Sequence, residues 1–171
     1  MKGARKFITL GVLIALVLTV GIITFTNVPH TQTPANTQIR LYVYGTKNCS
    51  WCNRMMQDSS QVIPTSNIIF LEIDPQIVTT TTNLTAFFTL GNIVSDNHTE
   101  KIGTPLCVVY DPVSNGIALW DGYIEPQQLA QILNTVQTGT TIFANIDNGA
   151  WTPMTQEDIE TVMNVLALTT K

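Results

Sequence analysis

Hydrophobic and polar positions alternate with two different periods along this 171-residue chain. Short runs rich in β-branched and aromatic residues, bounded by Gly, Pro, Asn or Asp, predict four β-strands. These strands are expected at residues 39–44, 68–73, 106–110 and 117–121. Apolar residues three and four positions apart predict helices from about 49 to before 64, over 126–136 and onward from 155, with a shorter one within 84–94. The order β-α-β-(α)-β-β-α predicts an α/β fold with a parallel unit first and an antiparallel hairpin after it.

Turn and cap residues separate these segments. Asn115-Gly116 lies between two β runs, and this dipeptide is a strong hairpin signal. Pro126 suits the first turn of a helix. Thr155, with Asp158 three residues later, is similar to a capping box, so the last helix is expected to begin there and to pack one apolar face.

The start of the chain has a different pattern. Residues 7–25 form an uncharged apolar run of 19 residues, which as a helix would extend about 28 Å, close to the hydrocarbon thickness of a bilayer. Lys2, Arg5 and Lys6 precede this run and no basic residue follows it until Arg40, so the positive-inside rule places the N-terminus in the cytoplasm and everything after Asn27 outside. A cleaved signal peptide is the alternative, although its apolar core would be only about 7–15 residues and a small-residue cleavage site would follow it. The sequence therefore predicts a single-pass signal anchor in the cell membrane.

Composition and charge limit the remainder. Residues 26–38 are rich in Thr, Pro and Asn without a hydrophobic period, which predicts a flexible linker. A folded domain is expected over 39–138, and residues 139–171 are a C-terminal extension with an amphipathic helix. An apolar content of 44% excludes disorder over the whole length. Residues 39–171 carry 5 basic and 12 acidic residues, a net charge of −7, which disfavours binding to nucleic acid.

The candidate chemistry lies in Cys49-Ser50-Trp51-Cys52, which follows a predicted strand and opens a predicted helix. Cysteines at this spacing at a helix start can close a small disulfide. Backbone N–H groups and the helix dipole favour thiolate over thiol there, which makes the first cysteine a nucleophile. The second cysteine, one turn into the helix, can resolve the mixed disulfide. A strand–CxxC–helix context is what a redox motif requires.

Several motifs occur in the order found in a known family. They are YGTKNCSWC at 44–52, LEID at 71–74, Gly103-Thr104-Pro105 before a strand, the Asn-Gly hairpin, and Gly122-Tyr123 with its following helix. Together they resemble the thioredoxin superfamily over about residues 39–136. The string C-x-W-C-x-x-M from Cys49 to Met55 is also similar to thioredoxin-like proteins with Trp before the second cysteine. The resemblance implies a thioredoxin-like domain over 39–138, with a mixed central sheet flanked by helices.

The resemblance also implies the roles of individual residues. Cys49 would be the nucleophile and Cys52 the resolving cysteine, while Ser50, Trp51, Thr104 and Pro105 would belong to the active site and the substrate-binding surface. Pro105 would be cis and lie against the disulfide, and Thr104 would offer backbone hydrogen bonds to a bound peptide. No metal or cofactor is needed, because the dithiol–disulfide pair carries both electrons.

The chain departs from the family pattern around the cysteines. Val43 stands six positions before Cys49, where thioredoxins often bury an acid, and Phe70 stands where a lysine partners that acid. Glu72, two residues on, is either on the same strand face or at the surface. Asn48 replaces the tryptophan that usually precedes the first cysteine, and Ser-Trp replaces Gly-Pro. Because the two intervening residues tune the reduction potential, a reductase role does not follow from the motif alone.

The cysteines and aromatic residues also fit other roles. CxxC can be half of a zinc site, but His30, His98 and Cys107 form no second ligand pair at a suitable spacing. Cys107 lies in an apolar strand and is expected to be inert core. Trp51 is either a substrate-facing aromatic or a cover for the disulfide.

Three N-x-[ST] motifs are present. Those at Asn83 and Asn97 lie in a loop-rich region and could carry glycans if the host glycosylates its exterior. The motif at Asn48 would place a glycan on the active site, so we discount it.

These observations predict a membrane-anchored thiol–disulfide oxidoreductase acting on protein cysteines outside the cytoplasm, recharged by a membrane redox partner. A non-catalytic binding or metal-carrying assembly module on the same scaffold is the alternative. The oxidising exterior, and Val43 in place of a buried acid, favour disulfide formation in exported proteins. Reduction, with electrons passed across the membrane by a partner, is the alternative direction.

Overall fold

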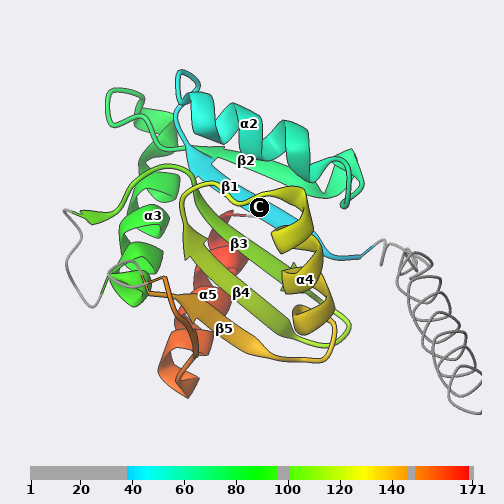
Figure 1. Ribbon diagram of the computed structural model, residues 1–171. Coiled ribbons are helices and arrows are strands. Elements are labelled where there is room, and N and C mark those ends of the chain that lie inside the picture. The colour runs from blue at the N-terminus through cyan, green and yellow to red at the C-terminus, as the bar shows by residue number, and fades with distance from the viewer. Residues whose placement is uncertain (1–37, 96–100, 146–148, 170–171) are drawn as a thin grey trace, which may run out of the picture. The chain divides into compact units, whose positions relative to one another are not determined.

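The computed structural model describes residues 38–95, 101–145 and 149–169, and within them six strands form one mixed sheet (Figure 1). The strands are β1 (Arg40–Gly45), β2 (Ile68–Glu72), β3 (Leu106–Asp111), β4 (Gly116–Asp121), β5 (Thr141–Ala144) and β6 (Trp151–Pro153). The helices are α2 (Ser50–Ser59), α3 (Thr81–Val94), α4 (Pro126–Val136) and α5 (Gln156–Thr169), with short 3₁₀ turns η1 (Thr65–Asn67) and η2 (Val78–Thr80). The predicted α/β class is therefore confirmed.

The sheet has the order β2-β1-β3-β4-β5-β6. β1 pairs with β2 in parallel through the crossover helix α2, and β3 pairs antiparallel with both β1 and β4. The predicted parallel unit and antiparallel hairpin are both confirmed. Beyond them, β5 joins β4 in parallel and β6 closes the edge antiparallel to β5. The segment after residue 138 thus extends the same sheet.

Side chains on the two faces of the sheet build two separate hydrophobic clusters, because successive strand residues point to opposite faces. On β1, Tyr42 and Tyr44 pack in the cluster with α3 and α5, whereas Leu41 and Val43 pack in the cluster with α2 and α4. The central strands β3 and β4 alternate in the same way and are almost wholly buried. Figure 1 shows α2 and α4 on the near face of the sheet and α5 behind it. The cysteine motif therefore belongs to the α2–α4 face.

The hairpin and cap predictions can be followed residue by residue. Asn115 has a φ of +59°, the left-handed conformation that an Asn-Gly turn uses. At Gly116 a side chain would overlap the backbone carbonyl of Val136, so β4 and the end of α4 approach closely only because this residue is glycine. The Thr155 and Asp158 side chains each accept a hydrogen bond from the other's backbone N–H, at 3.1 and 3.0 Å, which completes the predicted capping box.

One helix is longer than expected, and two strands have no counterpart among the expected elements. α3 has 14 residues and begins at Thr81, earlier than the short helix expected within 84–94. β5 and β6 were not predicted at all. The expected anchor at 7–25 lies outside the described residues, as does the linker except for Gln38. Across the described ranges, no helix is long and apolar enough to cross a bilayer.

Candidate functional site

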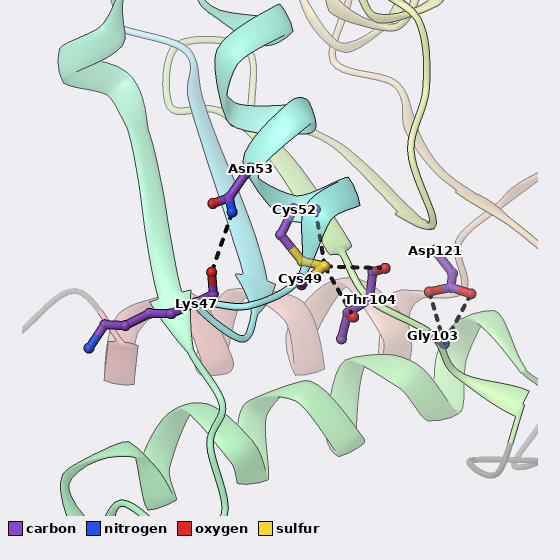
Figure 2. The surroundings of a disulfide bond; sticks show 7 residues. All are labelled: Lys47, Cys49, Cys52, Asn53, Gly103, Thr104 and Asp121. Carbon is purple, nitrogen blue, oxygen red and sulfur yellow. Dashed lines mark hydrogen bonds between the residues drawn. A yellow bond between two sulfur atoms is a disulfide. The ribbon is translucent and has the colours of Figure 1, made fainter.

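Cys49 and Cys52 form a disulfide at the start of α2, directly after the loop that leaves β1 (Figure 2). Cys49 is the N-cap residue of α2, with φ −76° and ψ 108°, and its sulfur accepts a hydrogen bond from the backbone N–H of Cys52 at 3.0 Å. The loop is closed by a hydrogen bond from the Cys49 N–H to the Thr46 carbonyl at 3.0 Å. The strand, loop and helix predicted from the sequence thus place the first sulfur at the N-terminal end of a helix.

The two cysteines differ in their exposure to solvent. Cys52 is completely buried in the cluster with α2 and α4, whereas Cys49 is half-buried. Room for the inner sulfur comes from Gly45, the last residue of β1, since a Cβ there would overlap Cys52 Sγ. A reagent or partner reaching the disulfide from solvent therefore meets Cys49 first. Sequence reasoning did not single out Gly45. No sequence pattern indicates that a glycine leaves room for a side chain seven positions away.

A second segment, from the loop before β3, contacts the outer sulfur. The Thr104 hydroxyl lies 3.4 Å from Cys49 Sγ, within range to donate to it, and the Thr104 carbonyl oxygen lies 3.7 Å away. The Thr104–Pro105 peptide bond is cis, which is the isomer that the resemblance implies. Thr104 is 55 residues from Cys49 in sequence. The structure thus brings together Cys49, Cys52 and Thr104, and Pro105 directly follows Thr104 in the chain.

The electrostatic surroundings of Cys49 favour a negative sulfur once the disulfide is reduced. The positive end of the α2 dipole, the Cys52 N–H and the Thr104 hydroxyl all face this sulfur. The first turn of α2 carries no acidic residue that would oppose them. Each of these interactions is stronger with a thiolate than with a thiol, whereas the Thr104 carbonyl oxygen, 3.7 Å from the same sulfur, acts against them.

The strand positions beside Cys52 are apolar. Val43 on β1 and Phe70 on β2 are register partners, and both pack in the same cluster as Cys52. Glu72 is two residues beyond Phe70 and therefore on the same face of β2. Its carboxylate is paired with the Lys47 ammonium at 3.0 Å, with the Lys47 side chain largely in solvent. The two positions at which the resemblance implies an acid and a lysine are thus occupied by an apolar pair.

Trp51 extends into solvent between the two cysteines, with 52% of its surface exposed, and Ser50 is exposed as well. The Trp51 ring stands 5.5 Å from that of Tyr123, and the Arg54 guanidinium lies over both rings, at 5.6 and 4.6 Å. The Tyr123 hydroxyl donates to Asp58 at 2.7 Å. Trp51 is therefore part of a surface bridge between α2 and the loop before α4.

The contacts within this bridge shift the pKa values of Tyr123 and Asp58. The hydrogen bond with Asp58, followed by desolvation, raises the pKa of Tyr123 to about 12. The same hydrogen bond, and then the contacts with Arg54, lower the pKa of Asp58. Sequence reasoning missed this group, although Arg54 and Asp58 have the i,i+4 spacing of a helical ion pair and lie 3.3 Å apart.

The remaining sequence expectations concern groups outside the disulfide. Cys107 is fully buried in β3 as expected, and desolvation, with a smaller contribution from Asp121, raises its pKa well above the ordinary thiol value. The Asn83 amide is part-buried and donates to the Glu72 carbonyl at 3.0 Å, so a glycan there would have to break this contact. Asn97 and His98 lie outside the described residues.

In the described part of the chain, no three His, Cys, Asp or Glu side chains are grouped so that they could hold a metal ion. Comparison of the sequence with protein-family models and curated proteins, and of the fold with solved structures, finds no match.

Proposed function

We propose that this chain is a thiol–disulfide oxidoreductase with a thioredoxin-like fold, in which Cys49 is the nucleophile and Cys52 the resolving cysteine. The observation that carries the proposal is the environment of Cys49. It is the half-buried N-cap of α2, and two hydrogen-bond donors from different segments point at its sulfur. A structural disulfide needs neither accessibility nor donors aimed at one of its sulfurs, whereas a nucleophilic thiolate benefits from both.

The proposed reaction is two consecutive exchanges. In the reducing direction, the Cys49 thiolate attacks one sulfur of a substrate disulfide, a mixed disulfide forms, and the other substrate sulfur leaves as a thiolate. Cys52 then loses its proton and attacks Cys49 Sγ, which releases the second substrate thiolate. The substrate gains two electrons and this chain ends as the Cys49–Cys52 disulfide. In the oxidising direction the same steps run backwards, and a substrate thiolate attacks Cys49.

The arrangement of elements supports the thioredoxin-like part of the proposal. A parallel β1-α2-β2 unit is followed by the antiparallel β3–β4 hairpin and α4, and the cysteines open the first helix of this series. Thr104, directly before β3, contacts the outer cysteine. Ser50, Trp51, Thr104 and Pro105 are proposed to line the path of a substrate polypeptide.

We further propose that the chain works outside the cytoplasm, held by the apolar segment 7–25, with a membrane redox protein as its recharging partner. The oxidising exterior, together with the apolar Val43–Phe70 pair beside Cys52, favours disulfide formation as the direction. The reduction potential decides between the two directions. A reduction potential of about −120 mV is expected of an oxidant, and one of about −270 mV of a reductase.

A trapping experiment tests the assignment of the two cysteines. Cys52→Ser in the full chain should accumulate mixed disulfides through Cys49, because the attacking sulfur remains and the resolving one is gone. Non-reducing electrophoresis with mass spectrometry of the linked peptides measures this. Cys107→Ser is the matched control and should accumulate no adducts, because Cys49 and Cys52 both remain and any mixed disulfide is resolved.

The outcome that contradicts the proposal is equally concrete. If Cys52→Ser forms no adducts, and the wild-type chain neither oxidises nor reduces a cysteine-containing protein, the oxidoreductase assignment is wrong. Tight stoichiometric zinc or copper on a chain without turnover would instead favour the metal-carrying alternative.

A further inference from the structure

Asp121, the last residue of β4, lies beside the loop that contacts the disulfide. Its register partner on β3 is Leu106, the residue that follows Pro105. Both carboxylate oxygens accept the backbone N–H of Gly103, at 3.1 and 3.2 Å (Figure 2). The side chain is half-buried, and neither the family pattern nor the proposed reaction gives it a role.

The end of β4 holds this loop on both sides of Thr104. On one side Asp121 accepts the Gly103 N–H, and on the other the Gly122 N–H donates to the Pro105 carbonyl at 2.8 Å. Thr104 is thus fixed between two hydrogen-bonded neighbours. Its hydroxyl and carbonyl then lie 3.4 and 3.7 Å from Cys49 Sγ.

The Asp121 carboxylate is partly removed from water, which costs free energy unless the carboxylate is hydrogen-bonded. Burial raises the pKa of Asp121, and the N–H groups of Gly103 and Gly122 act against that rise. A partly desolvated carboxylate needs the Gly103 donor, because the Gly122 N–H donates to the Pro105 carbonyl. A backbone N–H bound to a charged acceptor is also held more firmly than one bound to a neutral acceptor. Asp121 and Gly103 therefore restrain each other.

We propose that Asp121 is a positioning residue that, through Gly103, holds the Thr104 hydroxyl against Cys49 and so sets the reactivity of this sulfur. The inference deepens the proposed function in that it assumes Cys49 to be the reacting group. Asp121 touches neither sulfur in this scheme and acts only through the loop. Its effect must therefore disappear when the Thr104 hydroxyl is removed.

The test measures how fast iodoacetamide alkylates Cys49 in the reduced full chain as a function of pH, with the modified peptide identified by mass spectrometry. Thr104→Val removes the donor to the thiolate and should slow alkylation about three- to tenfold at pH values below the Cys49 pKa. Asp121→Ala should act in the same direction. Asp121→Asn keeps one acceptor for the Gly103 N–H and should restore most of the wild-type rate. The double variant Thr104→Val/Asp121→Ala should be no slower than Thr104→Val alone.

Asp111 supplies a matched control at the other end of the same hairpin. Its carboxylate also holds a turn, accepting the Val113 N–H at 2.9 Å and the Ser114 hydroxyl at 3.0 Å. Asp111→Ala should lower the unfolding temperature without changing the Cys49 pH profile. If Asp121→Ala does not fold, Asp121→Leu, which keeps the side-chain size without an acceptor, takes its place.

Two results would overturn the inference. One is an Asp121→Ala pH profile identical to wild type, and the other is an effect that adds fully to that of Thr104→Val. Because alkylation needs no substrate protein, this outcome is separate from that of the proposed function. A chain whose Cys49 reactivity follows Asp121 but which turns over no substrate would refute only the oxidoreductase assignment.

Discussion

Replacing Gly45 by alanine should destabilise the oxidised protein through one identifiable contact. The new Cβ would overlap Cys52 Sγ and lie 3.2 Å from Cys52 Cβ and 3.6 Å from the Phe70 ring. The sulfur cannot rotate away, because it is fully buried and bonded to Cys49. Overpacking of a core by one methyl group costs about 1–3 kcal/mol, and this restrained site belongs in the upper half of that range.

A double-mutant cycle isolates the contact. In the Cys52→Ala background the overlapping sulfur is absent and only the contacts with the Cβ of residue 52 at 3.2 Å and with the Phe70 ring at 3.6 Å remain, so Gly45→Ala should cost less than about 1 kcal/mol there. The coupling free energy should then be about 1–3 kcal/mol, and the contribution of the disulfide itself cancels in the cycle. Urea unfolding followed by circular dichroism measures all four variants.

Gly103→Ala is the control for a glycine substitution in this region. Its Cβ would reach only ordinary contact with the Asp121 carboxylate, 3.5 Å from the nearer oxygen, so its effect should stay within about 0.5 kcal/mol. If Gly45→Ala costs the same in both backgrounds, the steric explanation for this glycine is refuted, and with it our account of how Cys52 is accommodated.

Two further predictions use the titratable groups. Cys107 should resist iodoacetamide at pH 8 in the folded, reduced chain and react after unfolding in urea, because burial raises the pKa of its thiol. Labelling of Cys107 as fast as that of Cys49 in the folded state would contradict this. The lowered pKa of Asp58 stabilises the fold above the carboxyl's ordinary pKa of about 3.9, and this stabilisation is lost as the pH falls through the lowered value. Tyr123→Phe removes the main cause of the shift, so the fall in unfolding temperature between pH 5 and pH 2 should be smaller than in wild type, and an unchanged fall would count against the hydrogen bond.

The parts of the fold with strong local signals could be predicted from the sequence. The helix over 126–136 has the expected bounds, because Pro126 fixes its first turn and its apolar residues fall on one face. The central strands were found to within one or two residues, since their β-branched runs end at clear turn residues. The cysteine motif was predictable for the same reason, as it depends on residues next to each other in the chain.

The missed elements lack such signals. All four residues of β5 are half-buried and all three of β6 are exposed, so neither strand has the alternation that indicates one. The contact of Asp121 with Gly103 joins residues 18 apart, and that of Thr104 with Cys49 joins residues 55 apart and was expected only from the family resemblance. Long-range contacts of this kind depend on strand register, which the sequence pattern of a single segment does not contain.

The separation of Thr104 from Cys49 in sequence also affects how the protein is made. While the chain is unfolded, Cys49 is an ordinary cysteine in a polar stretch, without an ordered helix end and without Thr104 nearby. The Thr104 hydroxyl lies near the sulfur only when β3 has paired with β1 and with β4, and when Asp121 and Gly122 at the end of β4 have formed their hydrogen bonds with the loop. If Cys49 is the nucleophile that we propose, a newly synthesised chain therefore carries a less reactive thiol until these strands have paired.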